Sequence, residues 1–249
     1  MQTFPLTLVA GPPGAGKTTW IRQQLDGAER FAYLNLGADA VRIDATYLAA
    51  EVPELVVWSS WLPELADFTK YQTYIELDFH IDLGSLVLPT EFADCHRVAV
   101  LPPGIRQTEW HDWADVIVTG TETRVPLQPP QLWRSLLTGQ VLDFASLTTV
   151  WDELINGAYG HVQRAKGIFE VTDGRSLYFD FVAGDPEPTS TELDLPRWLE
   201  GRPNRFSGVE VVGEQLDETA IAQTLKDCCL DDRTLAYYQQ QVREFLEDG

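Results

Sequence analysis

The stretch from Gly11 to Thr18, GPPGAGKT, constrains the fold of this chain more than any other part of the sequence. It fits the Walker A pattern, in which a glycine and four further residues precede Gly-Lys-Ser/Thr. The apolar run 6–10 before it reads as a buried strand, and residues 19–25 after it open a helix. A strand, a glycine-rich loop and a helix in this order are typical of a loop that binds phosphate groups.

The residues of this loop have separate expected roles at such a site. Its glycines permit a tight turn and bring backbone N–H groups against phosphate oxygens, while the helix N-terminus adds its positive dipole end. Lys17 is expected to reach the β and γ phosphates, and the hydroxyl of Thr18 to ligate Mg²⁺. The residues expected to contact the nucleotide are Gly11, Gly14, Ala15, Gly16, Lys17, Thr18 and Thr19.

Short apolar runs and helical segments alternate along the first half of the chain. The runs that read as strands are 31–36, 55–58, 96–101 and 115–119, and the segments that read as helices include 44–51 and 61–68. Such alternation predicts a parallel sheet with flanking helices, an α/β fold of the P-loop NTPase type.

One further segment, 74–82, alternates strictly between apolar and polar residues and is predicted to be a strand. Its polar face carries Glu76, Asp78, His80 and Asp82, so the strand has a solvated face or functional carboxylates at its carboxyl end. Asp78, His80 and Asp82 have the spacing of metal ligands, although such side chains on an exposed strand are more often solvated.

The second half has a different pattern. Helices are predicted at 131–137, 146–155, 217–230 and 231–245, strands at 166–171, 176–182 and 208–212, and a loop at 185–191. Asp173-Gly174 between two of the strands indicates a hairpin. We expect a nucleotide-binding domain over 1–130, a helical connection over 131–160 and a smaller α+β domain over 161–249.

Charge and cysteine content limit the classes of partner. Thirty-eight Asp and Glu against eighteen Lys and Arg give a formal charge of −20, which repels nucleic acid and anionic membranes. Arg164 and Lys166 are either a basic contact for a partner or phosphate, or solvated or ion-paired side chains at the entrance of a strand. Three cysteines, Cys95, Cys228 and Cys229, suggest no disulfide framework and no thiolate zinc site. Without a signal or membrane-spanning pattern, a cytoplasmic protein is expected.

Several of these signatures together resemble the CobW family of P-loop nucleotide-binding proteins, which is related to the UreG and HypB metallochaperone GTPases. The first half resembles it in residues 5–19, in Asn35 leading to Asp44, and in 113–118. Residues 163–169 and 209–217 resemble the C-terminal domain of that family. The resemblance implies a nucleotide-dependent task that involves a client protein or a metal, with Glu76 as a catalytic or Mg²⁺-associated carboxylate.

The chain departs from the pattern of that family at three places. No cysteine lies between Asp44 and Tyr74, where the family has a Cys-x-Cys-Cys metal motif. The family's Glu-x-x-Gly is Glu76-Leu77-Asp78-Phe79 here, and its guanine-reading Asn-Lys-x-Asp corresponds to residues 120–123, Gly-Thr-Glu-Thr. The resemblance therefore implies a GTP- or ATP-binding protein with slow hydrolysis, or an adaptor that binds nucleotide but has lost turnover. A kinase is less favoured, because no arginine-rich lid is evident.

The departure at residues 120–123 predicts weak discrimination between bases. A hydroxyl such as that of Thr123 makes one hydrogen bond where an aspartate makes two, a difference of about 1 kcal/mol, or less than one decade in affinity. We expect calorimetric titration with Mg²⁺ to give dissociation constants for GTP and ATP within roughly tenfold of each other. A preference for GTP of about a thousandfold would contradict this and indicate that another carboxylate, Glu122 first, reads the base.

Overall fold

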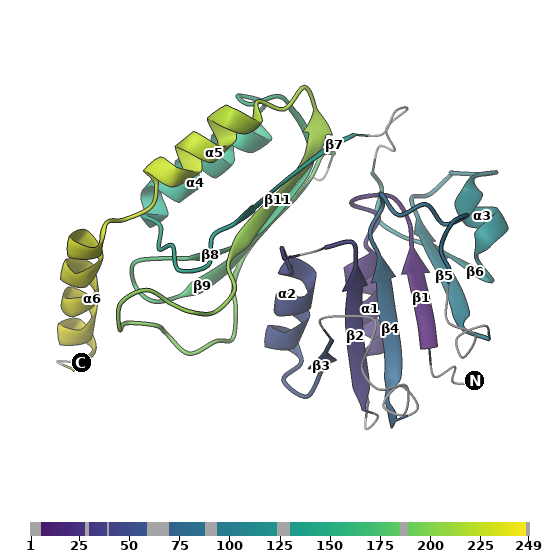
Figure 1. Ribbon diagram of the computed structural model, residues 1–249, viewed down its shortest axis with the longest axis horizontal. Helices are drawn as coiled ribbons and strands as arrows, with labels where there is room; N and C mark the ends of the chain where they lie inside the picture. The colour runs from purple at the N-terminus through teal and green to yellow at the C-terminus, as the bar shows by residue number, and fades with distance from the viewer. Residues whose placement is uncertain are drawn as a thin grey trace. The chain divides into compact units, whose positions relative to one another are not determined.

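The computed structural model divides the chain into two units, Met1–Leu127 and Gln128–Gly249, each with its own sheet (Figure 1). The residues that it describes are 6–27, 30–38, 40–58, 70–87, 94–123, 130–184 and 189–247. Each unit is treated below by itself.

The first unit is built on a six-stranded sheet whose strands are all parallel, in the order β3-β2-β4-β1-β5-β6. Its strands are β1 (Leu6–Ala10), β2 (Phe31–Leu36), β3 (Val56–Val57), β4 (Gln72–Leu77), β5 (His96–Leu101) and β6 (Val116–Thr119). Its helices among the described residues are α1 (Lys17–Gln24), α2 (Ile43–Glu51) and α3 (Glu109–Trp113). This architecture confirms the predicted α/β fold with a parallel sheet and flanking helices.

The two faces of this sheet have separate cores, because successive side chains of a strand point to opposite faces. On one face Val9 and Tyr33 pack with Ile21 of α1 and Leu48 of α2. On the other face Leu8, Leu34 and Ile75 form the buried cluster, against which Trp110 and Trp113 of α3 pack. The central strand β1 is buried throughout its length, so the loop that follows it starts from a fixed position.

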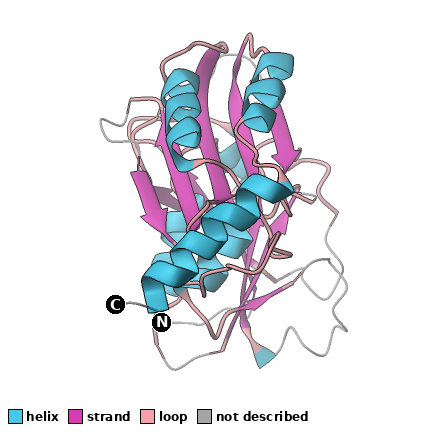
Figure 2. Ribbon diagram, turned by 90° about the vertical axis from the view of Figure 1, so that its left-hand side faces the viewer, coloured by secondary structure: helices cyan, strands magenta, loops and turns pink. Residues whose placement is uncertain are grey.

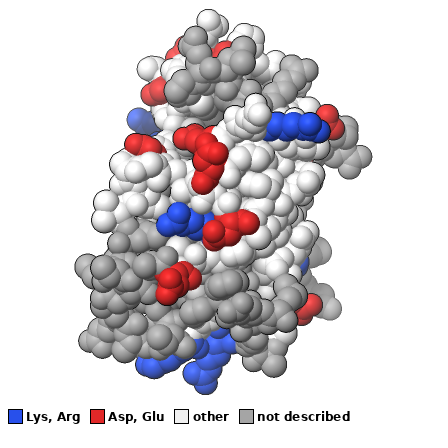
Figure 3. Space-filling model, turned by 90° about the vertical axis from the view of Figure 1, so that its right-hand side faces the viewer, with Lys and Arg blue, Asp and Glu red and all other residues white. Residues whose placement is uncertain are grey.

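Charged side chains on one face of the molecule are visible in Figure 3. Acidic and basic groups lie there singly or in small groups among uncharged residues. Such a surface has no extended region of one sign among the described residues in that view.

The second unit is an antiparallel five-stranded sheet in the order β10-β9-β8-β11-β7. Its strands are β7 (Gln131–Leu136), β8 (His161–Glu170), β9 (Ser176–Val182), β10 (Thr189–Glu192) and β11 (Gly208–Glu214), and its helices are α4 (Phe144–Ile155), α5 (Glu218–Asp227) and α6 (Asp232–Glu247). Helices α4 and α5 cover one face of the sheet (Figure 1). Trp151 of α4 meets Phe169 and Phe179 edge to face, with ring centroids 6.1 and 5.2 Å away, at the centre of this core.

Aspartates cap all three helices of this unit. Asp143 accepts from the backbone N–H of Ser146, Asp217 from that of Ala220 and Asp231 from that of Thr234. Each satisfies a donor that the first turn of a helix leaves unpaired. The helices predicted to start at 217 and 231 thus begin directly after their capping aspartates, at Glu218 and Asp232.

The predicted helix at 131–137 is wrong, because Gln131–Leu136 forms strand β7. This segment pairs antiparallel with β11 from Gln131 opposite Gly213 to Leu136 opposite Gly208. The pairing satisfies its backbone groups at the sheet edge, which outweighs a helical preference over so few residues. Residues 131–160 are thus part of the second unit, where a helical connection was expected.

The predicted strand at 74–82 ends early, since β4 stops at Leu77. The N–H of Asp78 still donates to Leu36 of β2, but Ile81 then donates back to the carbonyl of Asp78 in a turn. The alternation of apolar and polar residues therefore extends past the end of the strand, into residues that form a turn. The predicted loop at 185–191 also needs correction, because β10 begins at Thr189.

Two sequence predictions concern residues outside the described part of the chain. The helix expected at 61–68 falls within the gap between 58 and 70. The proline-containing segment from 124 to 129 also lies outside it.

Ion pairs link neighbouring strands in the sheet of the second unit. The buried carboxylate of Glu210 on β11 pairs with Arg134 of β7, with 2.7 Å between Nη2 and Oε2, and with Lys166 of β8 at 3.1 Å. Arg164 pairs with Asp180 of β9. The basic residues Arg164 and Lys166 are thus ion-paired on their strand, one of the two alternatives that the sequence left open.

The environment of Glu210 shifts its pKa. Burial of the carboxyl raises the pKa, but the charges of Lys166 and Arg134 and their hydrogen bonds outweigh burial and lower it from 4.5 to about 2. Because the folded-state pKa is lowered, the ionised carboxylate stabilises the fold above about pH 4.5, and this stabilisation is lost as the pH falls toward about 2.

We therefore predict that Glu210→Gln destabilises the second unit at pH 7 by roughly 3–5 kcal/mol, since it removes the buried carboxylate charge that pairs with both Arg134 and Lys166. The difference from the unchanged protein should shrink as the pH falls from about 4.5 toward 2. Hydrogen exchange of amides in β8 and β11 measures the unfolding free energy of this unit. Glu214→Gln, which changes an exposed carboxylate on the same strand, is the control, and an equal effect in both variants would contradict the argument.

Candidate functional site

The loop between β1 and α1 has a backbone that only glycine allows at two positions. At Gly11, φ is +146°, and a Cβ atom would lie 2.2 Å from the carbonyl oxygen of Val100 on β5. At Gly16, the N-cap of α1, φ is +90°. The loop therefore packs tightly on the neighbouring strand and then turns directly into the helix.

Lys17, the first residue of α1, is buried. Its Nζ donates to the carbonyl oxygens of Gly11 at 3.1 Å and Pro12 at 3.3 Å. Among the described residues these neutral oxygens are its only hydrogen-bond partners, so no carboxylate neutralises its charge there. A buried cation held against a loop of backbone amides is an arrangement that favours an anion.

Thr18 and Glu76 come together from sequence positions far apart. The Thr18 hydroxyl lies 3.2 and 3.0 Å from the two carboxylate oxygens of Glu76. Glu76 is buried near the carboxyl end of β4, opposite Val9 of β1 and Asn35 of β2 in the strand register. Because parallel strands end at one edge of the sheet, the first turn of α1 and the end of β4 meet there.

Tyr33 is a member of this group that the sequence reasoning missed. Its hydroxyl donates to Oε2 of Glu76 at 2.9 Å from a fully buried position on β2. Burial raises the pKa of Tyr33 well above its usual value, and the neighbouring Glu76 and Asp44 carboxylates raise it further. The phenol therefore stays protonated and acts as a donor. A tyrosine inside an otherwise apolar run was the available signal, since a buried hydroxyl needs a partner.

Asp44 and Asn35 form the other side of the group. Asp44, in the first turn of α2, is buried and accepts from Nδ2 of Asn35 at 3.3 Å. The amide oxygen of Asn35 is buried and has no hydrogen-bond partner among the described residues. A buried hydrogen-bond acceptor that has no donor lowers the stability of the fold, unless a ligand or water supplies the missing donor or binds to it.

The donor atoms of this group are suited to a hard cation. Hydroxyl, carboxylate and amide oxygens come from Thr18, Glu76, Asp44 and Asn35, and Mg²⁺ prefers oxygen ligands, of which the protein commonly supplies one or two. The residues present thus fit a Mg²⁺ ion that also takes phosphate oxygens and water. Within the described ranges, no three His, Cys, Asp or Glu side chains gather as a protein-only metal site.

The segment after β6 also contacts the loop. The N–H of Thr121 donates to the carbonyl oxygen of Ala15 at 3.0 Å, and a Cβ on Gly120 would lie 2.0 Å from that oxygen. The residues that correspond to a base-reading motif thus begin beside the phosphate loop, while the side chains of Thr121 and Glu122 are exposed.

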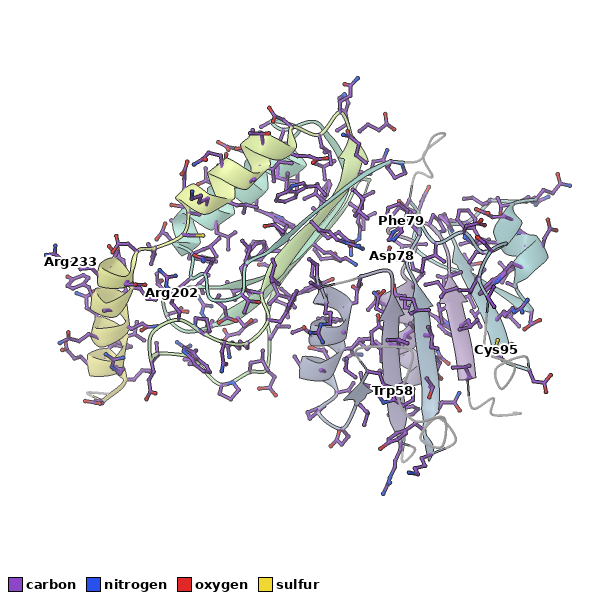
Figure 4. The ribbon with its side chains drawn as sticks, in the orientation of Figure 1. Trp58, Asp78, Phe79, Cys95, Arg202 and Arg233 are labelled. Atoms are coloured by element: carbon purple, nitrogen blue, oxygen red, sulfur yellow. The ribbon has the colours of Figure 1, made fainter. Side chains whose placement is uncertain are left out.

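Asp78, His80 and Asp82 do not form the metal site that was one alternative from the sequence. His80 lies 3.7 Å from Asp78, whereas Asp82 accepts from Gly84 and Ser85 in its own turn. In Figure 4, Asp78 and Phe79 lie at the carboxyl end of β4. The N–H of Phe79 donates to Oδ1 of Asp78 at 2.9 Å, so this amide is already hydrogen-bonded.

The three cysteines lie outside this group and carry raised thiol pKa values. Burial raises the pKa of Cys95 and Cys229, and burial together with the neighbouring Cys229 raises that of Cys228 to about 11. The three thiols are therefore protonated at neutral pH in this structure.

Comparison with known proteins identifies the second unit. Residues 123–229 match the family model described as the cobalamin synthesis protein cobW C-terminal domain. This span runs from just before β7 to just after α5, and in the first unit a Walker A loop connects a parallel strand to a helix. The second unit therefore matches a CobW C-terminal domain.

Two solved structures are similar to this chain over most of its length. Zn(II)-bound YjiA GTPase from E. coli has 14% identity and a TM-score of 0.33, covering 92% of this chain and 99% of that one. A Zn(II)-bound triple mutant of YjiA GTPase has 15% identity and a TM-score of 0.34 with the same coverage. No curated protein matches this chain in sequence.

The group around Glu76 predicts the effect of changing Tyr33. Tyr33→Phe keeps the ring but removes a donor to a buried carboxylate, which should destabilise the first unit by about 1–3 kcal/mol. Urea unfolding, together with hydrogen exchange in β2 and β4, measures the change. Tyr71→Phe, which removes a hydroxyl from a half-buried tyrosine at the start of β4, is the control. Equal changes in the two variants would refute the role assigned to the phenol.

Proposed function

We propose that this protein binds a nucleoside triphosphate, GTP or ATP, with Mg²⁺ and hydrolyses it slowly. The nucleotide state changes its hold on a client protein or a metal. The observation that carries the proposal is the contact of Thr18 with Glu76 beside the buried ammonium of Lys17. Loop amides, a cation and a carboxylate next to a threonine hydroxyl are the groups that phosphoryl transfer requires.

Each residue of the loop has a role in this proposal. The backbone N–H groups of Gly11, Gly14, Ala15, Gly16, Lys17, Thr18 and Thr19 hold phosphate oxygens at the start of α1, and Lys17 exchanges its carbonyl partners for the β and γ phosphates. In a protein of charge −20, a polyphosphate depends on such local positive groups.

Mg²⁺ would be held by the hydroxyl of Thr18 and by phosphate oxygens, with Glu76 acting through a bound water. When bound, the ion neutralises the charge that develops on the transferred phosphoryl group. Glu76 keeps the hydroxyl of Thr18 oriented toward this position and offers a carboxylate for positioning the attacking water. The hydroxyl of Tyr33 holds the Glu76 carboxylate in place through a hydrogen bond. Asp44 in the first turn of α2 and Asn35 on β2 supply further oxygen atoms.

A second candidate function is a nucleotide-binding adaptor that has lost turnover. The observation that favours it is the N–H of Phe79, which donates to Asp78 where the family resemblance implies a glycine near the γ-phosphate. An amide that is hydrogen-bonded within its own turn does not report the third phosphate. Both candidates keep the grip on the phosphates, and they differ in turnover.

The cellular setting is part of the proposal. No helix in the described ranges is long and apolar enough to cross a membrane. We propose a cytoplasmic protein whose partners are a nucleoside triphosphate and a protein client, with no nucleic acid or membrane partner.

The test is nucleotide binding and phosphate release by the Lys17→Ala variant. Loss of the buried ammonium should weaken the affinity for GTP and ATP in the presence of Mg²⁺ by roughly tenfold or more, about 1.4 kcal/mol. Calorimetry measures affinity, and phosphate release measures turnover.

Lys226→Ala is the matched control, because it removes an exposed lysine of α5 in the other unit. Unchanged affinity in Lys17→Ala would overturn the P-loop assignment. Tight Mg²⁺-dependent binding without phosphate release in the unchanged protein would select the adaptor.

A further inference from the structure

The phosphate end of the candidate site is built from buried groups. Lys17 is 8% and Glu76 4% exposed, and Asp44 is buried as well. A hydrogen bond from a charged group that is shielded from water contributes more to binding than one at the surface, where water competes for the same atoms. The groups that can contribute most to the affinity for a ligand therefore lie around the phosphate loop.

The strand order indicates where the rest of a nucleotide would lie. β1 has β4 and then β2 on one side, and β5 and then β6 on the other. The oxygen atoms that suit Mg²⁺ come from the first side, from Glu76 on β4, Asn35 on β2 and Asp44 at the start of α2. Mg²⁺ bridges the β and γ phosphates, so a sugar and base extend from the opposite end of the ligand. At the carboxyl ends of the strands they would meet the segments after β5 and β6, residues 102–108 and 120–123.

The segment after β6 is fixed on the phosphate loop by its backbone. The N–H of Thr121 donates to the carbonyl oxygen of Ala15 at 3.0 Å, and Gly120 approaches the same oxygen so closely that a Cβ atom would lie 2.0 Å from it. The side chains of Thr121 and Glu122 are exposed. Neither of them offers a buried polar group that could pair with a base.

The composition of both segments is also unsuited to holding a base. Residues 102–108 are PPGIRQT and residues 120–129 are GTETRVPLQP, and neither stretch contains an aromatic residue on which a base could stack. Glu122 is the single carboxylate in the two stretches. Because it is exposed, a hydrogen bond from a base to this carboxylate would replace one from water, with little net gain.

The sheet ends on the side where the base would lie. β6 is the last strand there (Figure 1), and Val116 and Ile117 on it are 43% and 41% exposed. Among the residues that the structure describes, no strand pairs with the outer edge of β6. A base at this edge would stay in contact with water, so its burial would add little to the affinity.

We propose that the site recognises the triphosphate group alone, so that inorganic triphosphate with Mg²⁺ binds about as tightly as any nucleoside triphosphate. This inference rests on the proposed function, because it concerns the same site, and it names the ligand class as polyphosphates. Lys17 and the loop amides meet the same phosphate oxygens in every such ligand. The base changes the affinity by less than about tenfold, the equivalent of one exposed hydrogen bond.

The test is calorimetric titration of the full chain in the presence of Mg²⁺ with GTP, ATP, CTP, UTP and inorganic triphosphate. All five dissociation constants should lie within about tenfold of one another. If GTP binds but any other of the five ligands binds more than about tenfold more weakly, the inference is wrong while the proposed function stands. If none of the five binds, both are wrong.

Two variants separate the phosphate end of the site from the base end. Lys17→Ala should weaken the binding of all five ligands by the same factor, roughly tenfold or more, because the ammonium group meets only phosphate oxygens. Glu122→Gln keeps the shape of the exposed side chain and removes its charge, and it should leave the ratio of the affinities for GTP and inorganic triphosphate unchanged. A loss of GTP affinity alone in Glu122→Gln would show that this carboxylate reads guanine, and it would overturn the inference.

Lys226→Ala is the matched control for the loss of a cation. Lys226 lies on α5 of the second unit, where α4 and α5 cover one face of their own sheet (Figure 2). Its replacement should leave all five affinities as they are in the unchanged protein. An effect as large as that of Lys17→Ala would mean that overall charge governs binding, which would contradict the inference. Thermal unfolding of each variant confirms that it is folded.

Discussion

The hydrogen bond from Thr18 to Glu76 is the contact on which the candidate site depends. It joins the first turn of α1 to the end of β4, across more than fifty residues of sequence. Two features make it possible: the parallel pairing of β1 with β4, and a loop whose glycines let the helix start directly after the strand. Tyr33 then holds the carboxylate from the neighbouring strand, so three elements fix one acidic group. A site held in this way needs little reorganisation when a ligand arrives.

The glycine-rich loop and many of the strands could be predicted from the sequence, because the patterns that indicate them lie within a few consecutive residues. The spacing of glycines, lysine and threonine defines the loop, and β2, β5 and β9 have the bounds that their apolar runs indicate. The site residues that were missed depend on pairing between strands. Tyr33 reaches Glu76 only because β2 lies next to β4, which no local pattern reveals. Likewise, the segment 131–136 is a strand because β11 is available as its partner.

The second unit shows how a strongly charged chain can still build an interior. One face of its sheet holds the buried Glu210 between the partly buried Arg134 and Lys166, while its helices cover the opposite face with apolar and aromatic side chains. Alternation in β11 puts Val209 and Val211 on one face and Glu210 on the other. From sequence, Lys166 and Arg164 could also have been a basic contact for a partner or phosphate. Their acidic partners lie on the neighbouring strands β11 and β9, so the register of strand pairing decides whether these basic residues form ion pairs.

The turn after β4 has a consequence for what nucleotide exchange could accomplish. The N–H of Phe79 is already donated to Asp78, and Asp78 itself is tied to β2 through Leu36. If the proposed nucleotide binds, the amide of Phe79 in this turn offers its third phosphate no free donor. A difference between diphosphate and triphosphate would then have to act through Lys17 and through the Thr18–Glu76 pair. The conformational signal would in that case leave the site along α1 and β4, while the turn after β4 stays unchanged.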